Sequence, residues 1–369
     1  MLLAISSLRI VLTKNPVFSE TSRKEVLGGG GAWGSIGNGL ATPSATPADV
    51  TGLTSGVVKV VTSGAGIGGS GRVHACAVTS AGTLNCWGAN SHGQLGNGTT
   101  TDAFSPVTVF TSGVLDVEVS FEEHTCAILS GGALKCWGRN DYGQLGNNSI
   151  VDSHIPVDVS GLSAGVTAMS GSTSHTSAIV NGGMKCWGSN IRAELGQGST
   201  GTPQLIPADV PGMLSGITSI SATGNYGQNK TCAVVNGGAK CWGQGYGGTL
   251  GDGTQTDRFS PTTVTGLSSG VTKIQINDYS ACALMDTGAL KCWGGNGNAE
   301  AGLGTIGATT SPSLVLGIQA GVLDFDLGHG LTCTRVIGNA VKCWGNNANG
   351  AMGIGYFNYS FTPIDIMFP

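Results

Sequence analysis

Short runs of alternating apolar and polar residues recur along the whole chain and predict β-strands. Residues 124–128, 165–169 and 270–274 are examples of this pattern, which has the period of a half-buried strand. Clusters of Gly, Asn, Asp and Ser separate the runs, as expected of turns. No stretch long enough for a helix shows a helical period. The pattern therefore predicts an all-β protein.

The apolar runs belong to a repeated unit of about 50 residues. Every tryptophan is followed by glycine, and successive tryptophans lie 54, 50, 50, 55, 51 and 51 residues apart. A proline follows each one, 14 residues downstream in the first unit and 19 or 20 in the others. A period that accounts for every tryptophan indicates a repeat architecture. The tryptophans are Trp33, Trp87, Trp137, Trp187, Trp242, Trp293 and Trp344.

The cysteines set the register of a hairpin inside the unit. Directly opposed residues of a hairpin have position numbers with a constant sum, and Cys126 and Cys136 are centred on Gly131. Cys232 and Cys241 are only nine residues apart, and their centre falls between Asn and Gly at 236–237, the preferred two-residue turn. The turn length changes while the two positions stay opposed. We therefore expect adjacent antiparallel strands here in every unit.

Four short strands per unit, repeated around a ring, are typical of a β-propeller. Seven Trp-Gly units predict seven blades, of which the first is degenerate. One blade cannot bury both of its faces alone, so the ring should form one domain. We expect residues 28–369 to be this single propeller domain. Residues 1–27 are compatible with a secretion signal, a degenerate first strand or a truncated start.

Composition excludes several classes of protein. Charged residues make up only 10% of the chain, and 17 basic against 21 acidic residues give a net charge of −4, a poor match for DNA or RNA. The 64 glycines lack a three-residue period, which excludes collagen. No apolar run is long enough for a transmembrane helix. No motif indicates a cofactor, and the absence of a CxxC motif argues against a metal site.

The cysteines form five opposed pairs and leave Cys186 facing Ser177. Opposed strand residues have Cβ atoms roughly 4.5–5.5 Å apart, close to the separation of about 3.5–4.5 Å in a disulfide. Five disulfides would indicate an oxidising compartment; the alternative is that the pairs are small buried apolar residues. The expected disulfides are Cys76–Cys86, Cys126–Cys136, Cys232–Cys241, Cys282–Cys292 and Cys333–Cys343.

The repeated motifs resemble the regulator-of-chromosome-condensation repeat. The resemblance rests on segments 124–129 (HTCAIL), 134–140 (LKCWGRN) and 143–146 (GQLG), and it covers residues 28–366. The Cys-rich form is similar to bacterial, often exported, members. The resemblance implies a seven-bladed propeller that usually binds proteins. It also implies that the C-terminal strand near residues 363–366 closes the ring beside the blade that contains Trp33.

The expected function is a non-enzymatic protein-binding scaffold, exported or at the cell surface, that acts as a monomer on a protein partner of unknown identity. The founder of the resembling family is an exchange factor for a small GTPase, so one alternative is a cytoplasmic GTPase regulator. An inhibitor of a secreted enzyme is another. The GxSxG matches at 161–165 and 266–270 recur as a linker position of the repeat and are interpreted as turns, not as nucleophile elbows.

The candidate binding residues lie in the loop whose length varies most between units. Insertions in repeat proteins gather on one face, often the binding face, and aromatic residues beside acids resemble interface anchors. Ordinary turn chemistry is the alternative. Asp141 and Tyr142 are expected on the opposite face. The candidates are Phe121, Glu122, Glu123, His124, Tyr226, Asp278, Tyr279 and His329. His74, His124 and His175 share one repeat position, where they could converge near the axis or serve as polar residues at strand ends.

Overall fold

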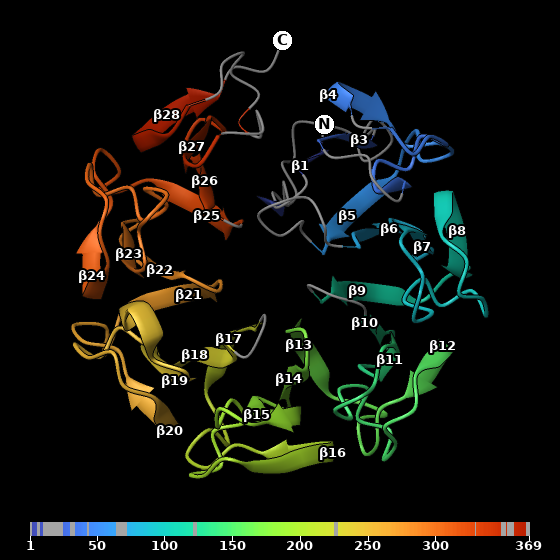
Figure 1. Cartoon of the computed structure of the whole chain (residues 1–369), viewed down its shortest axis with the longest axis horizontal. Coiled ribbons are helices and arrows are strands. Elements are labelled where there is room, and N and C mark those ends of the chain that lie inside the picture. The colour runs from blue at the N-terminus through green and yellow to red at the C-terminus, as the bar shows by residue number, and fades with distance from the viewer. Residues whose placement is uncertain are drawn as a thin grey trace.

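The computed structural model is a ring of β-sheets arranged around a central axis (Figure 1). The parts of the chain that it describes are residues 2–5, 8–9, 25–29, 34–42, 44–63, 72–120, 124–224, 228–328, 330–347, 352 and 358–366.

Six blades follow one another along the chain from residue 57, each a sheet of four antiparallel strands in sequence order from the axis outwards. The innermost strands are β5 (Val57–Thr62), β9 (Val114–Val119), β13 (Val166–Gly171), β17 (Ile217–Thr223), β21 (Val271–Ile276) and β25 (Val322–Leu327). The second strands are β6 (His74–Thr79), β10 (His124–Leu129), β14 (His175–Val180), β18 (Lys230–Val235), β22 (Ser280–Met285) and β26 (Leu331–Val336). The third strands are β7 (Leu84–Gly88), β11 (Leu134–Gly138), β15 (Gly183–Asn190), β19 (Gly238–Gly243), β23 (Leu290–Gly294) and β27 (Val341–Gly345). The outermost strands are β8 (Ala103–Phe110), β12 (Ser153–Asp158), β16 (Gly201–Asp209), β20 (Arg258–Thr263), β24 (Thr309–Leu314) and β28 (Ser360–Ile366).

The hairpin expected from the cysteine spacing is confirmed. Cys126 pairs with Cys136 across β10 and β11, and Cys232 pairs with Cys241 across β18 and β19. In the shorter turn, Asn236 and Gly237 both have positive φ, 49° and 75°, which is the requirement of a type I′ turn. The second and third strands of each blade are therefore fixed in register by local sequence.

The prediction of seven blades is wrong, because the N-terminal sheet is not built as a blade. This sheet has the order β2-β1-β3-β4, with β1 (Leu2–Ile5), β2 (Leu8–Arg9), β3 (Glu25–Gly29) and β4 (Ser44–Asp49). Strand β1 runs parallel to β3, whereas each of the six blades has an antiparallel pair at that place. Strand β2 contacts β5, β25 and β26, so this sheet fills the sector between the last blade and the first (Figure 1).

The miscount comes from Trp33, which does not align with the other tryptophans. The pairing of Leu27 with Ala48 and of Gly29 with Ser44 gives Gly28 the position that tryptophan holds in every blade. Gly28 lies 19 residues before Pro47, the usual spacing, whereas Trp33 lies 14 residues before it. Trp33 itself is outside the described residues. The first unit thus lacks the blade tryptophan, the cysteine pair and the usual strand order.

The expected closure by the C-terminal strand is also wrong. Strand β28 pairs antiparallel with β27, with Ile364 opposite Cys343, and forms the outer strand of its own blade. The proline segment of every unit pairs in this way with the Trp-Gly strand that precedes it. The ring is closed by the N-terminal sheet instead. The domain division at residue 28 stays a prediction.

The hydrophobic core lies in the seams between neighbouring sheets. One cluster joins Cys126, Cys136 and Leu145 of the second blade to Met169 and Trp187 of the third. Each of the six blade tryptophans is fully buried in such a cluster. The described cluster at the seam between the last blade and the N-terminal sheet has no tryptophan, as expected from glycine at position 28.

Each blade tryptophan packs against a glycine from the loop of the preceding unit. A Cβ on Gly146 would lie 2.7 Å from Nε1 of Trp187 and 2.9 Å from Val159 Cγ1, and its φ is +66°. Contacts this short force the surroundings to move, and positive φ strains any residue with a Cβ. The glycine of the GQLG motif is therefore required by the tryptophan of the next blade.

We predict that Gly146→Ala lowers the free energy of unfolding by about 3 kcal/mol, from left-handed strain together with overpacking against Trp187. The matched control is Gly161→Ala, because Gly161 has a φ of +73° and nothing within 4 Å of an added Cβ. The control should lose only about 1 kcal/mol. Urea denaturation of both variants measures the difference, and equal losses would show that the contact with Trp187 is unimportant.

Candidate functional site

The variable loops and the loops after the Trp-Gly strands emerge at the same end of each blade. His124, the first residue of β10, pairs with Gly138, the last residue of β11. The loop before β10 and the loop after β11 are therefore neighbours, and we call this end the loop face. Asp141 and Tyr142 belong to it, so the expectation that they lie on the opposite face is wrong. The opposite face carries the hairpin turns, including Ile337, and the links between blades, including Leu214.

The structure describes three of the eight candidate binding residues. Tyr279 is partly exposed on the loop face, whereas Asp278 is buried, with 7% of its surface exposed. His124 is buried at 1% exposure and cannot contact a partner directly. The other candidates, whose contribution to an interface stays a prediction, lie outside the described residues: Phe121, Glu122, Glu123, Tyr226 and His329.

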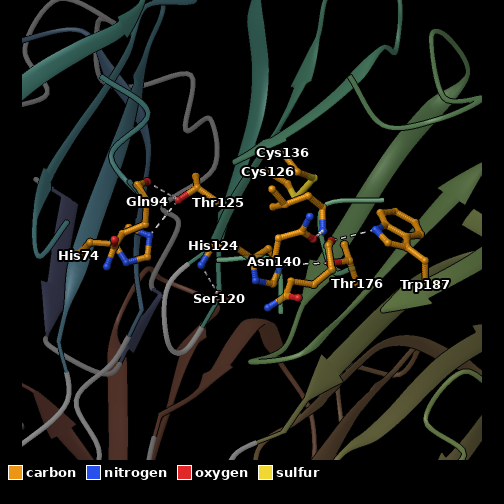
Figure 2. The surroundings of a disulfide bond; sticks show 12 residues. His74, Gln94, Ser120, His124, Thr125, Cys126, Cys136, Asn140, Thr176 and Trp187 are labelled. Carbon is orange, nitrogen blue, oxygen red and sulfur yellow. Dashed lines mark hydrogen bonds between the residues drawn. A yellow bond between two sulfur atoms is a disulfide. The ribbon is translucent and has the colours of Figure 1, made fainter. Parts of the chain in front are cut away.

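The three histidines of the repeated position do not meet at the axis, because each reaches into the neighbouring blade. Nε2 of His124 lies 3.1 Å from Oγ1 of Thr176 in the next blade. Its main-chain N–H donates to Ser120 Oγ in its own blade (Figure 2). The corresponding contacts in the other two seams, both 2.9 Å, are His74 Nε2 to Thr125 Oγ1 and His175 Nε2 to Thr231 Oγ1.

In each of these three seams, one main-chain carbonyl of the preceding blade accepts hydrogen bonds from both the threonine and the tryptophan. The Gln144 carbonyl accepts hydrogen bonds from Thr176 Oγ1 and Trp187 Nε1, both at 2.9 Å. The Gln94 carbonyl does the same for Thr125 (Figure 2) and for Trp137. Because the threonine hydroxyl donates to the carbonyl, its oxygen accepts from the histidine, which therefore carries its proton on Nε2. The result is a buried histidine–threonine–carbonyl chain across the seam.

Burial keeps these histidines neutral. It lowers the pKa of His74 to about 3, and it lowers that of His124 to about 3 with further contributions from His74 and His175. The pKa of His175 falls to about 4 through burial, opposed by the nearby Glu194 carboxylate. A neutral imidazole that donates to threonine is a structural element, and protonation of its Nδ1 would place a poorly compensated charge in the buried seam.

Lysine replaces histidine in the fourth blade and also crosses its seam. Lys230 is fully buried, and its Nζ donates to the main-chain carbonyl of Asp278 at 2.6 Å. Burial lowers the pKa of Lys230 to about 8, opposed by the Asp278 carboxylate. The Asp278 side chain accepts a hydrogen bond from Thr223 at 3.0 Å. Asp278 therefore connects the fourth and fifth blades.

Disulfides join all five opposed cysteine pairs, from Cys76–Cys86 to Cys333–Cys343. Their sulfurs belong to the buried seams. Cys186 remains a thiol 3.1 Å from the Ser177 hydroxyl, and burial raises its pKa to about 12. A thiol with so high a pKa is a poor nucleophile.

Several residues important to the seams were missed by sequence reasoning. The threonines after the histidine position recur as Thr125, Thr176, Thr231 and Thr332, a periodic signal that was available. Glu194 and Glu300, which stand where two other units have Gln, gave no such signal, because their role depends on neighbours from another blade. In the described part of the chain no group of three His, Cys, Asp or Glu side chains could hold a metal ion. No helix found there is long and apolar enough to cross a membrane.

Comparison with known proteins agrees with this architecture. Models of the regulator of chromosome condensation (RCC1) repeat match residues 132–179 in one form and residues 69–94, 116–144 and 271–299 in another. The chain therefore contains RCC1-type repeats, and they support its placement among propellers of this repeat type.

Solved structures share the fold over most of the chain. Human WBSCR16 is 20% identical, with a TM-score of 0.72 over 89% of this chain and 88% of its own. Yeast RCC1 (Prp20), in a complex with Kap60, is 16% identical, with a TM-score of 0.75 over 95% and 85%. Prp20p from Saccharomyces cerevisiae is 18% identical, with a TM-score of 0.74 over 95% and 87%. Identities this low establish similarity of fold.

We predict that the protein loses stability as the pH falls below about 6.5, the usual histidine pKa. The folded-state pKa of each seam histidine is lowered, so the unfolded chain binds more protons in acid. At about pH 5 each of the three should cost roughly 2 kcal/mol. Urea denaturation between pH 7.5 and pH 5 measures the loss.

His124→Gln should reduce this pH-dependent loss by about one third, because one of the three protonation sites is removed. His92→Gln is the control, since His92 is half-buried and bound to Asp152 at 2.7 Å on the loop face. An unchanged pH dependence in His124→Gln would contradict the assignment of the acid sensitivity to the seams.

Proposed function

We propose that this chain is a non-enzymatic, protein-binding propeller that works in an oxidising compartment, exported or at the cell surface. The observation that carries the proposal is the division between a repeated interior and a loop face that differs from blade to blade. Repeated residues cannot encode one partner, whereas residues that vary between blades can. The partner would therefore bind the loop face.

The chemistry of the interior supports binding over catalysis. The side chains of the histidines and the lysine at the start of the second strands are buried and form hydrogen bonds across the seams. The thiol of Cys186 is buried and has a raised pKa. Groups used in this way hold the scaffold rigid, and a rigid scaffold presents variable loops well for recognition.

The disulfides support the proposed location. Five bonded pairs are typical of secreted and cell-surface proteins and rare in the reducing cytosol. Each closes a short loop of nine or ten residues, so each restricts the unfolded chain only modestly.

A regulator of a small GTPase is the second candidate, and the structural similarity to Prp20 favours it. That protein has been solved bound to Kap60 and described with its binding properties to Gsp1p and histones. Acceleration of GDP release from a small GTPase by the purified chain would support this function over the first.

Alkylation tests the proposed compartment. We expect the natively produced, unreduced protein to take up one alkyl group after unfolding, on Cys186, and eleven after reduction, because ten of its 11 cysteines are bonded. Without unfolding, Cys186 should resist alkylation, since it is buried and its pKa is raised. Intact mass measures all three states, and eleven reactive thiols without reduction would contradict an oxidising location.

Alanine substitutions on the loop face test the proposed interface. We predict that Phe121→Ala, Tyr226→Ala and Tyr279→Ala each cost about 2 kcal/mol of binding energy, roughly a thirtyfold loss of affinity. Leu214→Ala and Ile337→Ala are the controls, because these side chains are 66% and 72% exposed on the opposite face. Calorimetry with the isolated partner measures the affinity of both sets of variants. A loss of affinity confined to the controls would contradict the prediction and place the interface on the face opposite the loop face.

A further inference from the structure

The outermost strand of each blade is an edge strand whose first half is already covered. In all six blades, a main-chain N–H from the loop of the preceding unit donates to the carbonyl two residues before the proline of the strand. In the first blade, Gly39 donates to Phe104 at 2.9 Å. The proline that follows has no N–H to offer. The part of each outermost strand that can still pair with another chain is therefore the part after its proline.

Strand β8 has the longest free segment of this kind. It continues for four residues after Pro106, through residues 107–110 (VTVF). Strand β28 continues for three residues after its proline, and the other four outermost strands continue for two. In the described part of the chain, β7 is the one strand that pairs with β8. Alternate main-chain groups of residues 107–110 therefore point outwards, where no described strand pairs with them.

The free segment of β8 also lacks the charge found on other edges. In the second, third and sixth blades, an exposed aspartate of the outermost strand pairs with a lysine of the third strand at 2.6–2.7 Å: Lys135–Asp158, Lys185–Asp209 and Lys342–Asp365. In the first blade the equivalent pair is Asn85 and Thr108, joined by a hydrogen bond at 2.9 Å. Strands β20 and β24 lack the aspartate too, but they end two residues after the proline. Charged residues on an edge strand oppose pairing with another chain, and β8 has none.

The sequence around Thr108 is symmetric, with a valine on each side. Val107 and Val109 share one face of β8 and pack, half-buried, against the core cluster that contains Trp137. Thr108 is exposed on the other face. In an antiparallel pair of two such strands centred on Thr108, each Val107 faces the Val109 of the other copy, and the two threonines face each other. Pairs of β-branched side chains stabilise a sheet in this arrangement, so the segment is complementary to itself.

We propose that two copies of this chain associate through β8, in an antiparallel pair with a two-fold axis at Thr108. Two four-stranded blades then form one continuous sheet. Both free edges are paired in one closed contact, as in the isologous interface of a dimer. The contact lies on the rim of the ring, where Figure 1 shows β8. The proposal therefore goes beyond the proposed function: it leaves both loop faces available to a partner and replaces the expectation of a monomer.

Sedimentation equilibrium tests the pairing. A contact through one strand is small, so the dimer should be weak, and the average mass should rise from one chain towards two as the concentration approaches about 0.5 mM. Asn85→Lys combined with Thr108→Asp gives the first blade the ion pair of three other blades and sets two aspartates against each other across the two-fold axis. This double variant should associate roughly tenfold more weakly or less, because like charges oppose each other. Thr263→Asp is the matched control, since Thr263 holds the equivalent position of β20, opposite Lys240, and it should associate like the unaltered chain.

A cysteine at the two-fold axis tests the geometry. In Thr108→Cys the two new thiols face each other across the strand pair, within reach of a disulfide. Oxidised glutathione should therefore link two chains into a dimer that a reductant separates, whereas Thr263→Cys should stay largely unlinked. Cys186 is buried and does not take part. An unaltered chain that stays monomeric up to about 0.5 mM, equal association by the double variant, or equal cross-linking of the two cysteine variants would overturn the proposal.

Discussion

The structure depends on one main-chain carbonyl per unit that receives hydrogen bonds from the next blade. In each of the six tryptophan seams this carbonyl accepts the indole N–H at 2.9–3.0 Å. In four of them it also accepts a threonine hydroxyl. Because carbonyl and donors are buried, losing either partner would leave an unsatisfied polar group in an apolar seam. The GQLG loop, the glycine against the indole and the histidine beside the threonine all serve this contact.

A ring held in this way separates structural from functional residues. A blade position that supports a seam must recur, and most of the chemically reactive side chains of the described chain occupy such positions. Recognition is left to the loop face, where the units differ. The seams themselves also differ in detail. Glu194 accepts hydrogen bonds from the side chains of Ser189 and Asn229, whereas in the next seam but one the positions that correspond to these two donors are glycine.

The N-terminal sector shows the consequence of losing the tryptophan. With glycine at position 28, the described part of the cluster at this seam, which includes Leu331, Val341, Met352 and Ile366, has no aromatic side chain. The sheet there is completed by a hairpin whose first strand runs parallel to β3. The usual antiparallel second strand, with its histidine or lysine and its cysteine, is absent from this sheet. In this sector the repeated sequence motifs therefore do not correspond to a repeated blade.

The sequence by itself determined the all-β class, the hairpin register and the cysteine pairs, because these follow from the period of two and from contacts ten residues apart. It also indicated the RCC1-type repeat, whose motifs are local. The number of blades and the closure of the ring were decided by the tertiary structure, since the pairing of β3 with β4 gives the tryptophan position to Gly28, and the order of the N-terminal sheet differs from that of a blade. Burial of His124 and Asp278 and the exposure of Tyr246 were likewise decided there. Each depends on residues about 50 positions away in the adjoining blade, and no local pattern encodes which side of a seam a side chain will face.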